Sequence, residues 1–307
     1  MNSLTSVTCR MEITHNSKLD ITPIESQLDD YTTGVIKAYG NLVNSSGCFT
    51  SNPISKLKGC TQFRENLLLE NIDIDQADIE SAERLETIFG ALIITNSNIQ
   101  NLSFFNSLKR ISAKIFIAAS LDIKNMPMLT GLAFPNLEIV ENKFENLFRV
   151  NLEDLHPDFC LTTQEMELFL ERRVIFHRLD GVFCWDEERS DGEIVCNFYN
   201  WEDLPSNCQH IVGDVILKLG DEIYTDKLRS VKGVYGILSF FHTRLTIVDF
   251  LPNLKFVGLI SAEPALRFVH NQRLQEVQLP SLKRVFSVKS DFLEIIRIGI
   301  KHHYAKI

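Results

Sequence analysis

Cysteines are the residues with the clearest chemical potential in this chain of 307 residues, which contains seven of them. Cys48 and Cys60 are 12 residues apart, and Cys196 and Cys208 repeat that spacing. A spacing that occurs twice favours one disulfide in each half of the chain. Each bond would join the segment that enters its half to the first strand of that half. The alternative to disulfides is that both pairs are buried free thiols, inherited when one ancestral segment was duplicated. Zinc is less favoured, because neither pair forms a close-set CxxC knuckle.

The remaining reactive residues form no catalytic pattern. Cys160 and Cys184 flank a predicted helix and are expected to form a third disulfide. Cys9 is the odd thiol, and His302 and His303 lie in a predicted solvent-exposed tail. The chain has no phosphate-binding glycine loop, no HExxH and no nucleophile elbow. We therefore predict a protein that is not an enzyme, with no catalytic residue, metal or cofactor.

Composition narrows the class of partner. Hydrophobic residues make up 45% and charged residues 23%, as in an ordinary globular protein. The net charge of −9 argues against nucleic acid or an anionic membrane as the main partner. No apolar run approaches the ~20 residues that span a bilayer. The N-terminus lacks the features of a secretory signal, whereas the cysteine pairs suggest an oxidising compartment.

A long stretch of the chain is written twice. The segment from Gly90 to Ile111 aligns without a gap with the segment from Gly236 to Val257. Blocks on either side agree as well, so the chain is predicted to hold two homologous units. The predicted boundaries are residues 48–184 and 196–307, with an acidic, solvated linker at 185–195. The second unit is either truncated or closed by the basic tail from Lys301 to Lys306. Residues 1–47 are either the remnant of a preceding unit or an unrelated arm.

Each unit repeats a short strand in which alternate residues are apolar. The strands begin 25 to 29 residues apart in the first unit, without a helical period between them, which favours a coil with one strand per turn. Asparagines that follow the strands, such as Asn96 and Asn125, suit tight corners. The predicted strands contain Leu67/Leu69, Leu92/Ile94, Leu121/Ile123, Phe148/Val150, Val215/Leu217, Leu238/Phe240, Leu266/Phe268 and Leu293/Ile295.

Two local motifs complete the pattern. Thr162 to Glu165 forms a capping box, so a helix is expected to start there and to close the first unit. The triplets that begin at Asn44 and Asn101 are glycosylation sequons, but two such triplets are expected by chance in a chain of this length.

The order of these motifs resembles a known family. The pattern C-x4-G-x-L-x-I occurs from Cys208 to Leu217, while Glu65 replaces its glycine in the first unit. The pattern G-x-L-x-I begins at Gly90 and again, with Phe240 last, at Gly236. FPNL follows Ala133, and its variant LPNL follows Phe250. Together these motifs resemble the receptor L domain of the insulin and epidermal growth factor receptor families, and the chain looks closest to nematode proteins built from such domains.

The resemblance implies a fold and a role. The expected fold is mainly β (α+β), with two tandem right-handed single-stranded β-helices, similar to leucine-rich repeats and closed by helical caps. The expected role is extracellular or cell-surface binding of a peptide or protein ligand, or of another receptor. The chain itself contains no membrane span. An intracellular leucine-rich scaffold is the competing hypothesis, which the missing secretory signal favours.

Candidate ligand-contacting residues come from two comparisons. Mapping the hormone-binding sheet of insulin-type receptors onto this chain implies Leu68, Glu70, Asn71, Thr95 and Asn96, although the last two positions depart from the aromatic and arginine residues expected there. Comparing the two copies shows that outward positions differ while buried ones agree. This second comparison adds Ile93 in the first copy and Ser239, Phe241 and His242 in the second.

Overall fold

The computed structural model describes residues 11–14, 36–39, 47–48, 57, 59–73, 76–113, 119–143, 147–185, 188–288 and 293–296. Strands dominate its regular structure, and helices are few and short. The chain forms two compact units. The first contains Met1–Phe159 and Arg172–Asp180, and the second contains Cys160–Glu171 and Gly181–Ile307.

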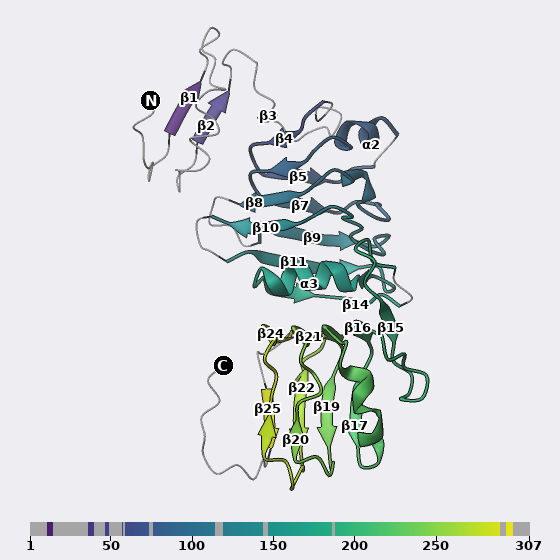
Figure 1. Ribbon diagram of the computed structural model, residues 1–307. Coiled ribbons are helices and arrows are strands. Elements are labelled where there is room, and N and C mark those ends of the chain that lie inside the picture. The colour runs from purple at the N-terminus through teal and green to yellow at the C-terminus, as the bar shows by residue number, and fades with distance from the viewer. Residues whose placement is uncertain are drawn as a thin grey trace. The chain divides into compact units, whose positions relative to one another are not determined.

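The first unit contains two five-stranded parallel sheets, which the chain visits alternately from β4 onward (Figure 1). One sheet consists of β3 (Gly47–Cys48), β4 (Gln62–Phe63), β6 (Thr87–Ile88), β8 (Arg110–Ala113) and β10 (Ile139–Asn142). The other consists of β5 (Leu67–Glu70), β7 (Leu92–Thr95), β9 (Leu121–Met126), β11 (Arg149–Leu155) and β13 (Ile175–Leu179). Among the described residues of this unit, the helices are α2 (Gln76–Ala82) and the 3-10 turn η2 (Ser103–Phe105). Near the N-terminus, β1 (Met11–Thr14) pairs in parallel with β2 (Ile36–Tyr39).

Alternating apolar residues explain the register of the sheet that contains β5, β7, β9, β11 and β13. Leu67 pairs with Leu92, and Leu92 pairs with Leu121, so identical residues stack along the sheet. The predicted strands at these positions are confirmed. In the fourth strand Val150, and not Phe148, aligns with Leu121. This shift of two residues leaves the same face buried, because side chains alternate with a period of two along a strand.

Tight corners follow the strands of the first unit. Asn71 and Asn96 directly follow β5 and β7, and Asn125 is the last but one residue of β9. All three have a φ of 52° or 53°, a left-handed conformation that asparagine tolerates better than most residues. The prediction that asparagines form tight corners is thus confirmed for Asn96 and Asn125. In the second unit His242 and His270 adopt the same conformation, with φ of 52° and 56°.

The second unit repeats the arrangement and adds two small two-stranded sheets. One sheet contains β15 (Val195–Asn197), β16 (His210–Val212), β18 (Gly233–Tyr235), β21 (Phe256–Leu259) and β24 (Arg284–Ser287). A second contains β17 (Val215–Lys218), β19 (Leu238–Phe241), β22 (Leu266–Val269) and β25 (Leu293–Ile296), in the order that the repeat predicted. The remaining elements are the pair β20 (Ile247–Val248) and β23 (Glu276–Val277), the pair β12 (Cys160–Leu161) and β14 (Val182–Phe183), and the 3-10 helix η3 (Asp221–Leu228).

Helix α3 (Thr163–Glu171) starts at the predicted capping box. The backbone N–H of Thr162 donates to Glu165 Oε2 at 3.0 Å, and the N–H of Glu165 donates to Thr162 Oγ1 at 3.1 Å. The sequence predicts that this helix closes the first unit, whereas its contacts place it in the second unit, against β21 and β24. Gly258 of β21 explains the packing. Because it has no side chain, Met166 and Leu170 of the helix can pack directly against the backbone of the strand.

The glycine that opens each copy of the repeated stretch lies directly against a neighbouring turn. A Cβ atom on Gly90 would lie 2.3 Å from the carbonyl oxygen of Glu65. A Cβ atom on Gly236 would lie 2.3 Å from the carbonyl oxygen of Gly213. Both partners are backbone atoms, which cannot rotate away. Close approach of successive turns therefore accounts for glycine at this position in both copies.

Candidate binding surfaces

The outward face of the first unit's second sheet is apolar at one end. Leu68 of β5 is 41% exposed and pairs in register with Ile93 of β7, which is partly buried. Glu70 follows Leu68 on the same face and is exposed. Three of the predicted ligand-contacting residues therefore lie together on the outward side of β5 and β7.

The face becomes polar along the sheet. Asn151 of β11 donates to Asp122 of β9 at 2.9 Å, and Lys124 lies 3.9 Å from the same aspartate. Arg178 of β13 forms an ion pair with Glu153 of β11 at 2.8 Å. The polar side chains on β9, β11 and β13 thus contact one another and border the apolar pair on β5 and β7.

Other predicted residues on this face have structural explanations. Thr95 is only 4% exposed, and in register it lies between the longer Glu70 and Lys124, so its side chain is not accessible to a ligand. Its burial does not support its prediction as a ligand contact. Asn71 and Asn96 are exposed, but they occupy the left-handed corners. Asn96 Oδ1 also accepts a hydrogen bond from Asn125 Nδ2 at 2.9 Å, so the corner explains the residue type.

The equivalent face of the second unit exposes larger apolar side chains. Phe241 of β19 is 40% exposed and pairs in register with Lys218 of β17. Ile216, Leu219 and Ile223 are exposed on β17 and just after it. None of these three residues was predicted as a ligand contact. Ile216 alternates with the buried Val215 and Leu217 and could have been recognised from that pattern, whereas Leu219 has the same parity as the buried residues and could not.

Ser239 repeats the behaviour of Thr95. It is 7% exposed and lies in register between Ile216 and Arg267, whose longer side chains flank it. Its burial does not support its prediction as a ligand contact. His242 is exposed, and its ring stacks on that of His270 at 4.9 Å and lies edge-on to Phe241 at 4.4 Å. The ring contacts order this corner of the face.

A hollow of about 470 Å³ in the second unit is lined by η3 and by the segment from Arg244 to Phe250. Glu222 at its edge accepts backbone hydrogen bonds from Gly220 and Arg244. Partial burial alone would raise the pKa of Glu222, but these donors outweigh it and hold the pKa below the usual value. Glu222 therefore stays ionised and braces the loop that lines the hollow.

Disulfides anchor the second unit at two places. Cys160 and Cys184 are joined, as predicted, with their Cα atoms 5.0 Å apart, and they connect β12 to the residue after β14. Cys196 and Cys208 are joined, also as predicted, with Cα atoms 6.0 Å apart. Cys60 is disulfide-bonded too, while the side chain of Cys48, its expected partner, lies outside the described residues. Cys9 also lies outside them.

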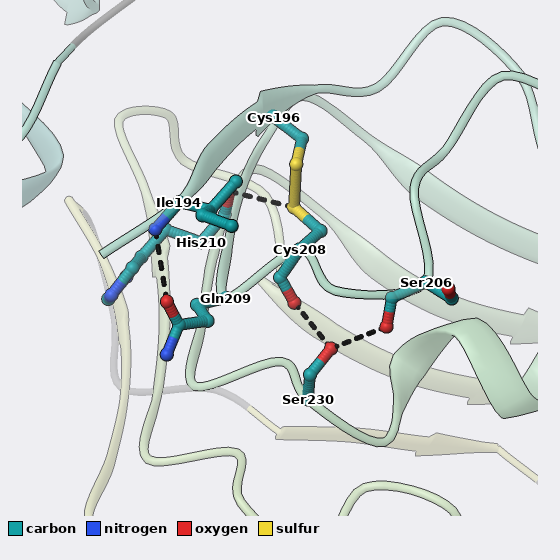
Figure 2. The surroundings of a disulfide bond; sticks show 7 residues. All are labelled: Ile194, Cys196, Ser206, Cys208, Gln209, His210 and Ser230. Atoms are coloured by element: carbon teal, nitrogen blue, oxygen red, sulfur yellow. Dashed lines mark hydrogen bonds between the residues drawn. A yellow bond between two sulfur atoms is a disulfide. The ribbon is translucent and has the colours of Figure 1, made fainter. Parts of the chain in front are cut away.

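Figure 2 shows how the Cys196–Cys208 bond is held. Cys196 lies in β15, and Cys208 precedes β16, the strand that pairs with β15. The Ser230 hydroxyl donates to the carbonyl oxygens of Ser206 and Cys208 at 2.9 and 2.8 Å. The bond therefore joins the entry segment to the start of the unit, as the repeated spacing indicated.

An ion-pair network lies in the segment that was predicted to be a solvated acidic linker. Arg189 is buried and contacts Asp191 at 2.7 Å and Glu167 of α3 at 2.8 Å. The hydrogen bond from Arg189 lowers the pKa of the Asp191 carboxyl to about 2. Part of the predicted linker is thus not a solvated surface, because its charges pair within the second unit.

The same network continues to His210 of β16. Glu193 contacts His210 Nε2 at 2.6 Å and also pairs with Lys232. Burial lowers the pKa of His210, although Glu193 partly opposes that effect. Because Arg189 and Lys232 bracket these groups, the network links α3, the segment after β14 and the sheet.

One group of three potential metal ligands occurs among the described residues. The donor atoms of Glu167, Glu193 and His210 lie within 4.8 Å of one another. Arg189 already pairs with Glu167, and Lys232 pairs with Glu193, so a divalent cation would have to displace both. The arrangement is explained by pairing of the charges, and we assign it a structural role.

Exposed apolar side chains on the outward face of a sheet are a feature that protein-binding surfaces share. The family comparison identifies the class of protein. The receptor L domain model matches residues 59–171 and 207–297, and the chain therefore belongs to the receptor L domain family. A comparison with curated proteins finds no match, so the nearer resemblance to nematode proteins stays a prediction. Within the described part of the chain, no helix has the length and apolar character needed to cross a bilayer.

Proposed function

We propose that this protein is a non-catalytic, receptor-like binding protein in which two receptor L domains bind a peptide or protein ligand, or another receptor, at their outward sheet faces. As sequence repeats, the proposed domains are residues 48–184 and 196–307, although by their contacts residues 160–171 and 181–184 of the first repeat belong to the second compact unit. The polypeptide adopts two right-handed single-stranded β-helices. In-register parallel pairing and alternate visits to the sheets support this geometry.

The exposed apolar side chains on equivalent faces of the two units carry the proposal. Leu68 and Ile93 lie side by side in the first unit, beside a polar network. Phe241 and Ile216 lie on the equivalent face of the second unit, next to Lys218. An apolar centre with a polar rim is typical of protein interfaces, where large side chains supply most of the binding energy. Burial within the chain does not explain these side chains, whereas a protein partner would.

The disulfides support an extracellular or cell-surface location. Cys160–Cys184 and Cys196–Cys208 are both formed. Disulfides persist in oxidising compartments and are rare in the cytosol. This favours the receptor-like hypothesis over an intracellular scaffold.

The compartment is tested by peptide mapping of the protein from its native source, without reduction and with alkylation of free thiols. We expect disulfide-linked peptides that contain Cys160 with Cys184 and Cys196 with Cys208. Recovery of all four as alkylated thiols would overturn the extracellular proposal.

Binding is tested with a display library of secreted proteins and ectodomains from the same organism. Leu68→Arg and Phe241→Arg each place a charge on one outward face, while Met128→Arg is the control, because Met128 is 43% exposed in the turn after β9. We expect at least one library member to lose about tenfold or more in affinity with one face variant, equal to about 1.4 kcal/mol, and to keep its affinity with the control. If every captured member bound both face variants with the same affinity as the native chain, the proposed surfaces would be contradicted.

A further inference from the structure

The triplet Asn101-Leu102-Ser103 lies in the connection between β7 and β8, where η2 begins at Ser103. Asn101 and Ser103 are exposed, whereas Leu102 between them is fully buried. The backbone N–H of Leu102 donates to the carbonyl oxygen of Leu132 at 3.0 Å. The buried residue thus anchors the connection and leaves both polar side chains of the triplet on the surface.

Hydrogen bonds orient the amide of Asn101. Its Oδ1 accepts from the backbone N–H of Ser103 at 3.1 Å and from Ser103 Oγ at 2.5 Å. None of the described residues bonds to Asn101 Nδ2. The hydroxyl therefore contacts the oxygen of the amide while the nitrogen is left to solvent, which is the atom that N-glycosylation modifies.

The surrounding surface is polar. Gln100 and Asn106 are exposed on the same connection. The carbonyl oxygen of Gln100 accepts from the backbone of Thr130 at 2.9 Å, and that of Asn106 accepts from Asn136 Nδ2 at 2.6 Å. A glycan on Asn101 would cover hydrated side chains and would not bury an apolar patch.

We propose that Asn101 is an N-glycosylation site of this protein, an inference that rests on the proposed extracellular location. The donor is a lipid-linked oligosaccharide diphosphate. Asn101 Nδ2 forms a bond to the anomeric carbon of the first sugar, the bond from that carbon to the diphosphate oxygen breaks, the lipid diphosphate leaves with the electron pair, and Nδ2 loses one proton.

The attachment point lies outside the strands that form the proposed binding face. Leu68 and Ile93 are on β5 and β7, whereas Asn101 follows the corner at Asn96. A glycan on the connection is therefore compatible with a ligand on the outward side of the sheet. The other sequon, at Asn44, lies outside the described residues, and the proposal does not include it.

The site is tested on the full chain, secreted from cultured insect cells behind a heterologous leader. Enzymatic deglycosylation in heavy-oxygen water converts a glycosylated asparagine into labelled aspartate, and mass spectrometry of the Asn101 peptide distinguishes it from Asn44. We expect labelled aspartate at position 101 in the native chain and in Ser103→Thr. Ser103→Ala is expected to remove it. Asn98→Gln, which alters an exposed asparagine outside any sequon, is expected to keep it.

Recovery of Asn101 without label from folded, secreted protein would overturn the glycosylation site. Disulfide mapping of the protein from its native source separates this failure from failure of the proposed function. Intact Cys160–Cys184 and Cys196–Cys208 bonds with unmodified Asn101 refute the site alone, whereas free thiols refute the extracellular proposal itself. Loss of label at Asn101 in Asn98→Gln would also contradict the proposal, because it would show that the sequon does not determine the modification.

Discussion

Replacing Gly236 by alanine tests whether the spacing between turns depends on a bare backbone. The new Cβ atom would lie 2.3 Å from the carbonyl oxygen and 2.6 Å from the carbonyl carbon of Gly213. Nonbonded atoms in a packed interior normally approach to ~3.5 Å, so one turn would have to move by about 1 Å. That movement would disturb the hydrogen bond from the Gly236 N–H to the Gly258 carbonyl, which is 2.8 Å long.

The expected cost has two sources. Overpacking a close-packed core costs about 1–3 kcal/mol. The φ of 153° at Gly236 is in a region that alanine rarely adopts, which adds roughly 1 kcal/mol or more. We therefore expect Gly236→Ala to lower the free energy of unfolding of the second unit by about 3 kcal/mol. With a urea dependence of ~2 kcal/mol per molar, the midpoint would fall by about 1.5 M.

Tryptophan fluorescence during urea unfolding measures this effect, because both tryptophans of the chain, Trp185 and Trp201, lie in the second unit. Trp201 is buried and packs edge-on against Phe198 at 5.1 Å, so unfolding should change its emission. Gly258→Ala is the matched control. The atoms nearest to its Cβ would be side-chain atoms of Leu170 and Met166, at 3.4 Å, and we expect a loss below about 1 kcal/mol.

A midpoint for Gly236→Ala that equals that of the native chain would refute the reasoning, because it would show that neighbouring turns separate at little cost. Equal losses in Gly236→Ala and Gly258→Ala would refute it as well. In that case any added methyl group in the second unit would be destabilising, and close approach of two backbones would not be the cause.

Three further predictions concern the same unit. Cys196→Ser with Cys208→Ser removes a disulfide between residues 12 apart in sequence and should cost about 3 kcal/mol in urea unfolding; no loss relative to the native chain would contradict the stabilising role. Thr162→Ala removes the side-chain cap of α3 and should cost about 1 kcal/mol in the same assay, while Thr162→Ser should cost much less. Because the folded pKa of Asp191 is about 2, below its unfolded value, its pairing with Arg189 stabilises the fold fully above pH ~4, and this stabilisation is lost as the pH falls from about 4 to about 2. Asp191→Asn should therefore reduce the pH dependence of unfolding in that window, and an unchanged dependence would show that the pair contributes nothing there.

The duplication made most of the strand order predictable. Leu92 and Leu238 occupy equivalent positions in the two copies, and both are buried members of parallel ladders. Repetition doubles the information about which residues face inward, because only those residues must stay alike. The corner asparagines were predictable for a local reason, since few residue types tolerate a positive φ.

Accessibility of the outward face was not predictable from the pattern. Thr95 and Ser239 point to the same side as exposed neighbours, yet both are buried. Their burial depends on longer side chains in the adjacent strands, which a single strand's alternation cannot reveal. The ion pairs of Arg189 were not predictable for the same reason. The acidic composition of residues 185–195 does not show that Arg189 pairs with Glu167 of α3 as well as with Asp191.

The destination of α3 shows a related limit. Its amphipathic sequence predicts that one side must be buried, but not which surface buries it. The helix packs against the strand at Gly258, a residue far from it in the sequence.

This placement of α3 means that the two units are interleaved along the chain. Cys160–Glu171 belongs to the second unit, but Arg172–Asp180, which follows it, belongs to the first. A single recombination breakpoint between residues 159 and 181 cannot therefore transfer either unit whole to another gene. Synthesis is affected in the same way, because the ribosome completes a helix of the second unit before it has made the last strand of the first.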